Sequence, residues 1–221
     1  MSMRDEILAK VRGAVSSTPV EKRHLAVQQR MDELEVGVQP YKISKKAEMI
    51  DLFVQKAEAA AATVVKCSAS KVEGEVLDYL RSNNLPLEIK TGENPELERY
   101  KIGKHKLLSV ETGRTYGDDM VTISTAAGGV AETGTLALTS GADNPSSLNF
   151  LPENHIVILK QSDIALHQEA VWELLREKYG KGGMPRTMNF ITGPSRSADI
   201  EQTMILGAHG PIRLHIIVVS N

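Results

Sequence analysis

Short apolar runs alternate with amphipathic stretches from about residue 44 to the C-terminal end, and this alternation constrains the fold more than any other feature. Candidate strands lie at 62–66, 87–89, 107–110, 120–124, 130–139, 155–160, 187–192 and 213–219. Helical spacing of apolar residues predicts helices from Ser44 through Val54, from Ser70 to Asn83, and over 163–179 and 198–206. Strands interleaved with helices predict an α/β domain with a mostly parallel sheet flanked by helices on both faces.

The first 43 residues differ in character from the remainder of the chain. Ile7, Leu8 and Val11 have helical spacing, with acids in the first turn, and predict an amphipathic N-terminal helix. A polar, charge-mixed stretch follows to about residue 40 and predicts a linker or a loosely attached helix pair. We therefore expect a helical arm and linker over 1–43 and an α/β domain over 44–221. The apolar face of the arm makes a homo-oligomer plausible.

The charge balance and hydropathy exclude two classes of partner. The 221 residues carry 26 Lys and Arg against 28 Asp and Glu, which gives a net charge of −2. Nucleic-acid binding proteins usually concentrate an excess of cations, so no nucleic-acid partner is expected. No stretch approaches the roughly 18 apolar residues of a membrane span, and the N-terminus has no apolar signal core. The chain is expected to be cytoplasmic.

Cysteine usage limits the cofactors that this chain could hold. Cys67 is the single cysteine, so the chain cannot form an internal disulfide or supply the thiolates of an iron–sulfur cluster. No pair of histidines has the i, i+4 spacing with a supporting Glu that is typical of a helical metal site. We expect no metal and no cofactor in this chain, and any cluster must belong to a partner. Cys67 follows an apolar run, which favours packing over reactivity.

Glu132 is the candidate catalytic residue. Within 130–139, a period of two places Glu132 on one strand face with Val130, Leu136 and Leu138. A carboxylate sheltered in this way could act as a general acid or base, or as a nucleophile toward an activated acyl group. It could equally be a structural Glu that accepts hydrogen bonds from a glycine-rich turn. The neighbouring glycines resemble a phosphate-binding loop, but the Lys which that loop requires is absent.

The turn after strand 187–192 is the candidate anion site. Gly193, Ser195, Arg196 and Ser197 precede the predicted helix at 198–206, and a helix N-terminus attracts anions through its free N–H groups. In the alternative reading, Ser197 is an N-cap and Asp199 a first-turn acid.

Two further groups of residues bear on anion binding. His209 lies in the next turn, where it could transfer protons or simply bond a backbone carbonyl. No Lys or Arg occurs from Val121 to Leu159, so cations for an anionic ligand must come from other segments. The candidates at predicted element ends are Arg114, Lys160, Arg186 and Arg196.

Several ordered motifs resemble one known family. They are Ala131-Glu-Thr-Gly-Thr-Leu136, Leu151-Pro, His155-Ile-Val157, Met184-Pro-Arg186, Ile191-Thr-Gly-Pro-Ser-Arg-Ser-Ala-Asp-Ile-Glu201 and Leu206-Gly-Ala-His-Gly-Pro211. Together they resemble the lactate-utilization protein C family, the LUD-domain group, over about residues 44–220. The family's motif positions in this chain include Glu132 and most of the candidate ligand-binding residues, and Ser197 is added from the turn described above. The candidate ligand-binding residues are Thr133, Gly134, Thr135, Gly193, Ser195, Arg196, Ser197, Asp199 and His209.

The resemblance implies a fold like that of the sugar-phosphate isomerase and CoA-transferase superfamily, and of 5-formyltetrahydrofolate cyclo-ligase. It also implies a role in oxidation of L-lactate to pyruvate, in a system whose other members carry iron–sulfur motifs. This chain would be the cluster-free component and would bind those partners or a small anion. Two alternatives stay open, namely a stand-alone transferase-like, isomerase-like or cyclo-ligase-like enzyme that uses Glu132, and a module that binds a nucleotide or acyl-CoA.

Overall fold

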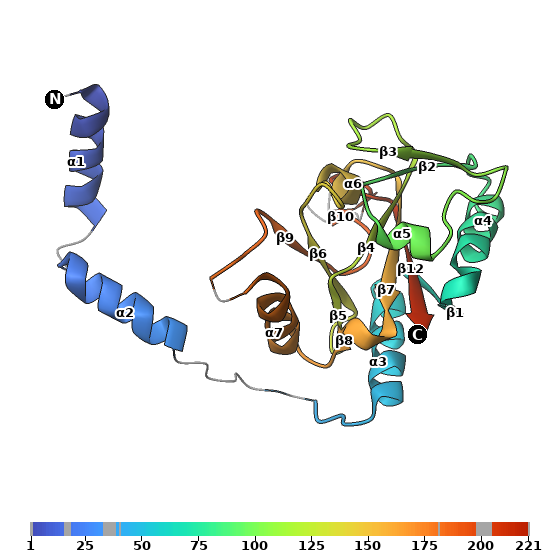
Figure 1. Cartoon of the computed structure of the whole chain (residues 1–221), viewed down its shortest axis with the longest axis horizontal. Helices are drawn as coiled ribbons and strands as arrows, with labels where there is room; N and C mark the ends of the chain where they lie inside the picture. Colours follow the sequence, from blue (N-terminus) through green and yellow to red (C-terminus); the bar gives the residue numbers. More distant parts are fainter. Residues whose placement is uncertain are drawn as a thin grey trace. The chain divides into compact units, whose positions relative to one another are not determined.

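The computed structural model describes residues 2–15, 19–32, 39, 41–180, 182–197 and 205–220, and the chain divides into two compact units. The first unit, Met1–Gln39, contains helices α1 (Met3–Val15) and α2 (Val20–Asp32). The second unit, Pro40–Asn221, contains every strand of the described residues (Figure 1). The N-terminal helix predicted from the spacing of its apolar residues is α1. None of the described helices is both long and apolar enough to span a bilayer.

Six strands form one parallel sheet in the order β1-β12-β7-β4-β2-β3. Their bounds are β1 (Thr63–Ser68), β2 (Glu88–Thr91), β3 (Ser109–Thr112), β4 (Val121–Thr125), β7 (Asn154–Lys160) and β12 (Arg213–Ser220). Every neighbouring pair in this sheet is parallel. The central strands β7 and β12 are buried along nearly their whole length, because both faces of a parallel sheet are covered. The predicted α/β fold with a mostly parallel sheet is confirmed.

Helices pack on both faces of this sheet. One face carries α4 (Val72–Ser82) and α5 (Glu96–Arg99), and Leu80 of α4 packs in the same buried cluster as Ile158 of β7. The other face carries α3 (Lys46–Ala59), whose Phe53 joins a second buried cluster with Val157 of β7. Because successive side chains of a strand point to opposite faces, neighbouring residues of β7 serve two different cores.

A second, four-stranded sheet has the order β8-β5-β6-β9 and corrects one prediction. Its strands are β5 (Gly128–Val130), β6 (Thr135–Thr139), β8 (Ile164–Ala165) and β9 (Met188–Ile191). The single strand predicted over 130–139 is wrong, because residues 131–134 form a turn and β5 and β6 pair as an antiparallel hairpin. Gly134 has a φ of +68°, which lets the chain reverse where other residues would be strained. Glu132 therefore lies in a turn and not on a strand face.

The segment predicted as a helix at 198–206 needs a second correction. Ile205–Leu206 (β11) pairs antiparallel with Arg196–Ser197 (β10), so the predicted helix does not include residues 205 and 206. Residues 198–204, and with them Asp199, lie outside the described residues. Arg196 and Ser197 belong to β10, and the start of the predicted helix lies outside the described residues, so anion binding at this turn stays a prediction.

The remaining helices are α6 (Ser147–Phe150) and α7 (Gln168–Tyr179), and two short 3-10 turns lie at Ala69–Lys71 and Gln161–Asp163. Helix α3 begins at Lys46 with Lys45 as its N-cap, whereas the sequence predicted a start at Ser44. Cys67 on β1 is a partly buried free thiol that packs against the α4 side of the sheet. Burial raises the pKa of this thiol, which agrees with a packing role.

Candidate functional site

A cavity of about 280 Å³ collects several of the predicted site residues near the start of β7 and β12. Segments that are distant in the sequence form its wall: the end of α6, the start of β7, β9 with the turn that joins it to β10, and the turn before β12. The lining residues are Asn149, Phe150, His155, Phe190, Ile191, Thr192, Gly193, Pro194, Ser195, Arg196, His209, Gly210, Pro211 and Leu214. Gly193, Ser195, Arg196 and His209, predicted from the sequence, thus line one cavity.

The backbone holds Ser195 firmly in this wall. Its N–H donates to the carbonyl of Pro211 at 2.9 Å, and its carbonyl accepts from Gly207 at 3.0 Å. The Ser195 hydroxyl oxygen accepts from the N–H of His209 at 3.3 Å, which ties the two predicted turns together. Gly193 permits this path, because its φ is +71° and an added Cβ would lie 2.1 Å from the carbonyl oxygen of Ala60. The exposed Arg196 adds a guanidinium to the lining.

His155 forms part of the inner wall and is fully buried. Its Nε2 lies 2.6 Å from the hydroxyl of Ser124. Burial lowers the pKa of His155 to about 3, so the ring is neutral at physiological pH. Within the described part of the chain, Nδ1 has no hydrogen-bond partner. A neutral imidazole with one unused nitrogen can donate or accept one hydrogen bond, according to its tautomer.

Asn149 also lines the cavity and is 1% exposed. Neither its amide oxygen nor its amide nitrogen has a hydrogen-bond partner among the described residues. Buried polar groups are nearly always hydrogen-bonded, so an unused donor and acceptor in one side chain point to a ligand or ordered water. The sequence analysis did not select Asn149. The signal was available, since this polar residue stands inside the apolar run from Leu148 to Leu151.

The structure does not bring Glu132 into this cavity. Its carboxylate accepts from Nδ1 of His167 at 2.8 Å, and Nε2 of His167 lies 2.9 Å from the carbonyl of Tyr41. The two side chains are only 16% and 6% exposed, respectively. The carboxylate and the carbonyl are both hydrogen-bond acceptors, so each ring nitrogen of His167 faces a polar partner. Glu132 is thus engaged in a partnered network, apart from Ser195 and Arg196.

A chain of hydroxyls connects the Glu132 turn to the cavity wall. Thr133 and Thr135 lie 2.7 Å apart at their hydroxyl oxygens, and Thr135 lies 2.6 Å from Thr192, which lines the cavity. Gly134 instead packs on α3, where an added Cβ would lie 2.3 Å from the backbone nitrogen of Ala57. Ser197 on β10 does not line the cavity. The structure thus gives Thr133 and Thr135 an indirect link and gives Gly134 a packing role.

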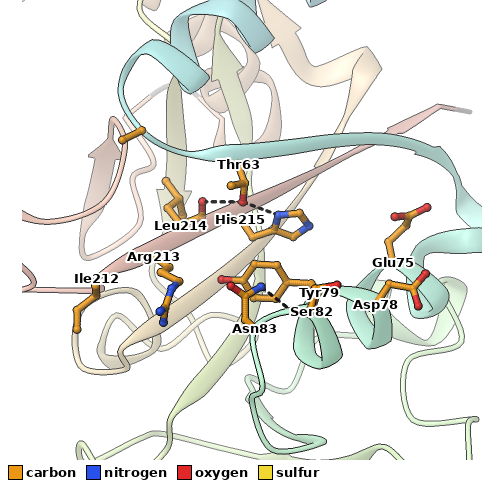
Figure 2. A pocket seen from close by; sticks show the side chains of 11 residues that line it. Thr63, Glu75, Asp78, Tyr79, Ser82, Asn83, Ile212, Arg213, Leu214 and His215 are labelled. Carbon is orange, nitrogen blue, oxygen red and sulfur yellow. Dashed lines mark hydrogen bonds between the residues drawn. The ribbon is translucent and has the colours of Figure 1, made fainter.

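A second cavity, of about 320 Å³, lies where β1 and β12 begin beside α4 (Figure 2). His215 stacks on Tyr79 with ring centroids 4.3 Å apart, and its Nδ1 lies 2.7 Å from the hydroxyl of Thr63. Burial lowers the pKa of His215 to about 4. The carboxylates of Glu75 and Asp78 line the same cavity. It contains none of the predicted site residues, so the cavity around Asn149 and His155 is the better candidate.

The described residues were also compared with the requirements of a metal site. Across the described ranges, no group of three or more His, Cys, Asp or Glu side chains is arranged to hold a metal ion.

Comparisons with known proteins identify the family. The model of the LUD domain family matches residues 13–219. Proteins named lactate utilization protein C from Geobacillus kaustophilus, Bacillus subtilis and Halalkalibacterium halodurans are 39%, 38% and 41% identical over 93 residues. Each match covers 42% of this chain and 39–40% of the relative, so the chain spans about two fifths of the length of these curated relatives.

A solved structure supports the fold. The crystal structure of a DUF162 family protein from Deinococcus radiodurans aligns with a TM-score of 0.60 at 20% identity, and the alignment covers 80% of this chain and 99% of that chain. At this identity the comparison supports the α/β architecture alone. The match of the family model over most of the sequence establishes that the chain belongs to the LUD domain family.

Proposed function

We propose that this chain acts in lactate utilization as a component without a redox centre of its own, and that the cavity beside His155 binds a small 2-hydroxy or 2-oxo carboxylate. Lactate and pyruvate are the simplest members of that class. The names of the relatives support the first part of the proposal. The single Cys67 supports the absence of a redox centre, because one cysteine cannot hold an iron–sulfur cluster and electron transfer through such a cluster would require partner proteins.

The combination of donors in the cavity is the observation that carries the ligand assignment. Arg196 offers a guanidinium, whose forked N–H groups match a carboxylate. Asn149 and the neutral His155 offer unused hydrogen-bonding atoms away from bulk water. A 2-hydroxy acid has a carboxylate for the first group and an adjacent hydroxyl for the second. A volume of about 280 Å³ accommodates a ligand of this size.

Calorimetric titration of the full chain tests the ligand. L-lactate, D-lactate and pyruvate are the probes, and propionate, which lacks the oxygen on the second carbon, is the matched control ligand. We expect Arg196→Ala and Asn149→Ala each to weaken binding by about ten-fold, a loss of about 1.4 kcal/mol. Arg176→Ala, an exposed change on α7, is the control variant. Equal affinity for propionate and lactate, or unchanged affinity in both cavity variants, would contradict this assignment.

A pull-down from the native cell tests the partners. A tagged chain should co-purify with iron–sulfur proteins and, when purified alone, should be colourless and unable to oxidise lactate with an artificial electron acceptor. Robust lactate oxidation by the isolated chain would remove the proposal that partners carry the redox chemistry.

The alternative of a stand-alone enzyme with Glu132 as nucleophile gains no support from the site, because His167 already occupies that carboxylate.

A further inference from the structure

A groove of about 750 Å³ lies beside the candidate site and plays no part in the function proposed above. Arg114, just after β3, and Arg186, just before β9, line it from segments 72 positions apart in the sequence. Helix α6 takes part in both sites: Ser147 lines the groove, whereas Asn149 lines the cavity. The groove and the cavity are therefore neighbours that share one short helix.

The two arginines of the groove are available to an external anion. Of the four cations selected from the sequence, Lys160 is paired with Glu96, whereas no described carboxylate pairs with Arg114 or Arg186. Both arginines are exposed along the groove. Among the described lining residues Glu93 is the one acid, so the two guanidinium groups leave a positive balance. An anionic ligand suits this balance.

Hydroxyl groups complete the lining of the groove. Ser140, Ser146, Ser147 and Thr187 all contribute to it. The Ser147 hydroxyl oxygen is buried and has no hydrogen-bond partner in the described part of the chain. The Ser140 oxygen accepts from the N–H of Thr187 at 2.8 Å, which leaves the Ser140 hydroxyl proton free to donate. Several donors around two guanidinium groups match the many oxygens of a phosphate chain.

We propose that this groove binds a phosphorylated ligand through a diphosphate group held between Arg114 and Arg186. Arginine is the residue most suited to phosphate, because its planar fork donates two parallel hydrogen bonds. The volume exceeds the need of a small carboxylate and accommodates a nucleotide. Glu93 and Arg114 follow the carboxyl ends of β2 and β3, the edge at which ligands bind in open α/β sheets.

Titration of the full chain with pyrophosphate and ADP, in low salt and without magnesium, tests the proposal. We expect Arg114→Ala and Arg186→Ala each to weaken binding of both probes by about ten-fold, and the double variant to abolish it. Arg114→Lys keeps the charge but not the fork, and should retain part of the affinity. Exposed Arg176→Ala is the control for a non-specific loss of positive charge.

The two probes also separate the possible sources of the diphosphate. ADP binding more tightly than pyrophosphate, with adenosine alone binding weakly, would assign a nucleotide; equal affinities would assign the phosphate chain itself. Wild-type chain that binds neither probe at millimolar concentration, or a double variant with wild-type affinity, would overturn the proposal. Arg196→Ala should weaken lactate binding and leave pyrophosphate binding within about two-fold, so failure of either site is distinguishable from failure of the other.

Discussion

Two buried polar pairs in this molecule differ in how well their hydrogen-bonding atoms are satisfied. Glu132 and His167 bond each other, and the second ring nitrogen of His167 reaches a backbone carbonyl. Asn149 and His155 are buried more deeply, yet both amide atoms of Asn149 and one nitrogen of His155 have no partner in the described ranges. The first arrangement is complete without a ligand. The second is incomplete, and incompleteness of a buried polar group is what a binding site requires.

This difference teaches that burial of a polar side chain is a poor guide to function by itself. Glu132 is a candidate catalytic residue in the sequence because burial of a carboxylate among apolar residues costs free energy. The hairpin turn offsets that cost by pairing the carboxylate with the imidazole of His167, and a catalytic role of Glu132 stays a prediction. Four predictions test the contrast between the partnered and the unpartnered pair.

The largest expected effect is the response of stability to pH. Burial lowers the pKa of His155 to about 3 and that of His215 to about 4, against about 6.5 in the unfolded chain. The unfolded chain therefore binds more protons, so the stability is fully present above pH 6.5 and is lost as pH falls toward the folded values. Each histidine should cost about 2 kcal/mol between pH 8 and pH 5, or about 4 kcal/mol together.

Urea unfolding at pH 8, 6 and 5 measures this loss. Carboxylates also titrate near the acid end, so the informative quantity is the difference between the wild type and His155→Gln. The variant should lose about half of the two-histidine pH effect. A variant with the full pH dependence of the wild type would show that His155 is not held neutral by its surroundings.

The next largest effect is expected at the turn that positions Glu132. Gly134→Ala adds a Cβ 2.3 Å from the backbone nitrogen of Ala57 at a φ of +68°, so both a clash and backbone strain result. We expect unfolding free energy to fall by about 3 kcal/mol. Gly182→Ala is the matched control, because its φ is +81° but nothing lies within 4 Å. It should cost about 1 kcal/mol, and equal losses in the two variants would show that packing on α3 contributes nothing.

A smaller effect is expected when the partnered network is broken. Glu132→Ala leaves the buried ring of His167 without its acceptor and should lower the unfolding free energy by about 2 kcal/mol. Glu169→Ala, an exposed change at the start of α7, should stay within about 0.5 kcal/mol. Lactate affinity of Glu132→Ala should stay within about two-fold of wild type. A stable Glu132→Ala variant that does not bind lactate would instead indicate that Glu132 contributes to the binding site.

The smallest change in stability is expected for the unpartnered pair. Asn149→Leu replaces an unsatisfied amide by an apolar group of similar size, so stability should change by less than about 1 kcal/mol or should rise. The same variant should lose lactate binding by about ten-fold or more. Thermal unfolding with and without lactate measures both quantities in one experiment. A strongly destabilised Asn149→Leu would indicate that the amide is satisfied within the protein, contrary to the comparison.

Sequence reasoning located the long strands well and the short ones poorly. β7 and β12 were predictable because burial on both faces requires an uninterrupted apolar run. The pairing of β10 with β11 involves two residues on each side, too few to create a periodic pattern. The hairpin of β5 and β6 was missed for another reason, since Val130 before the turn and Leu136 and Leu138 after it fit the alternation of a single strand.

Prediction of the site was likewise partial. Ser195, Arg196 and His209 were selected as ligand-binding candidates, and they line one cavity with Asn149 and His155. The binding role of these residues stays a prediction. The separation of Glu132 from them could not be read from the sequence, because it depends on a turn that directs the carboxylate to His167. Nor could the sequence reveal that Arg114 and Arg186 meet at one groove.

The last turn of α3 serves as a common support for two loops. An added Cβ on Gly134 would meet the backbone of Ala57, and one on Gly193 would meet the carbonyl of Ala60. A small displacement of this helix end should therefore shift both the chain of threonine hydroxyls and the rim of the cavity. Ligand affinity should consequently respond to substitutions in α3 that never touch the ligand.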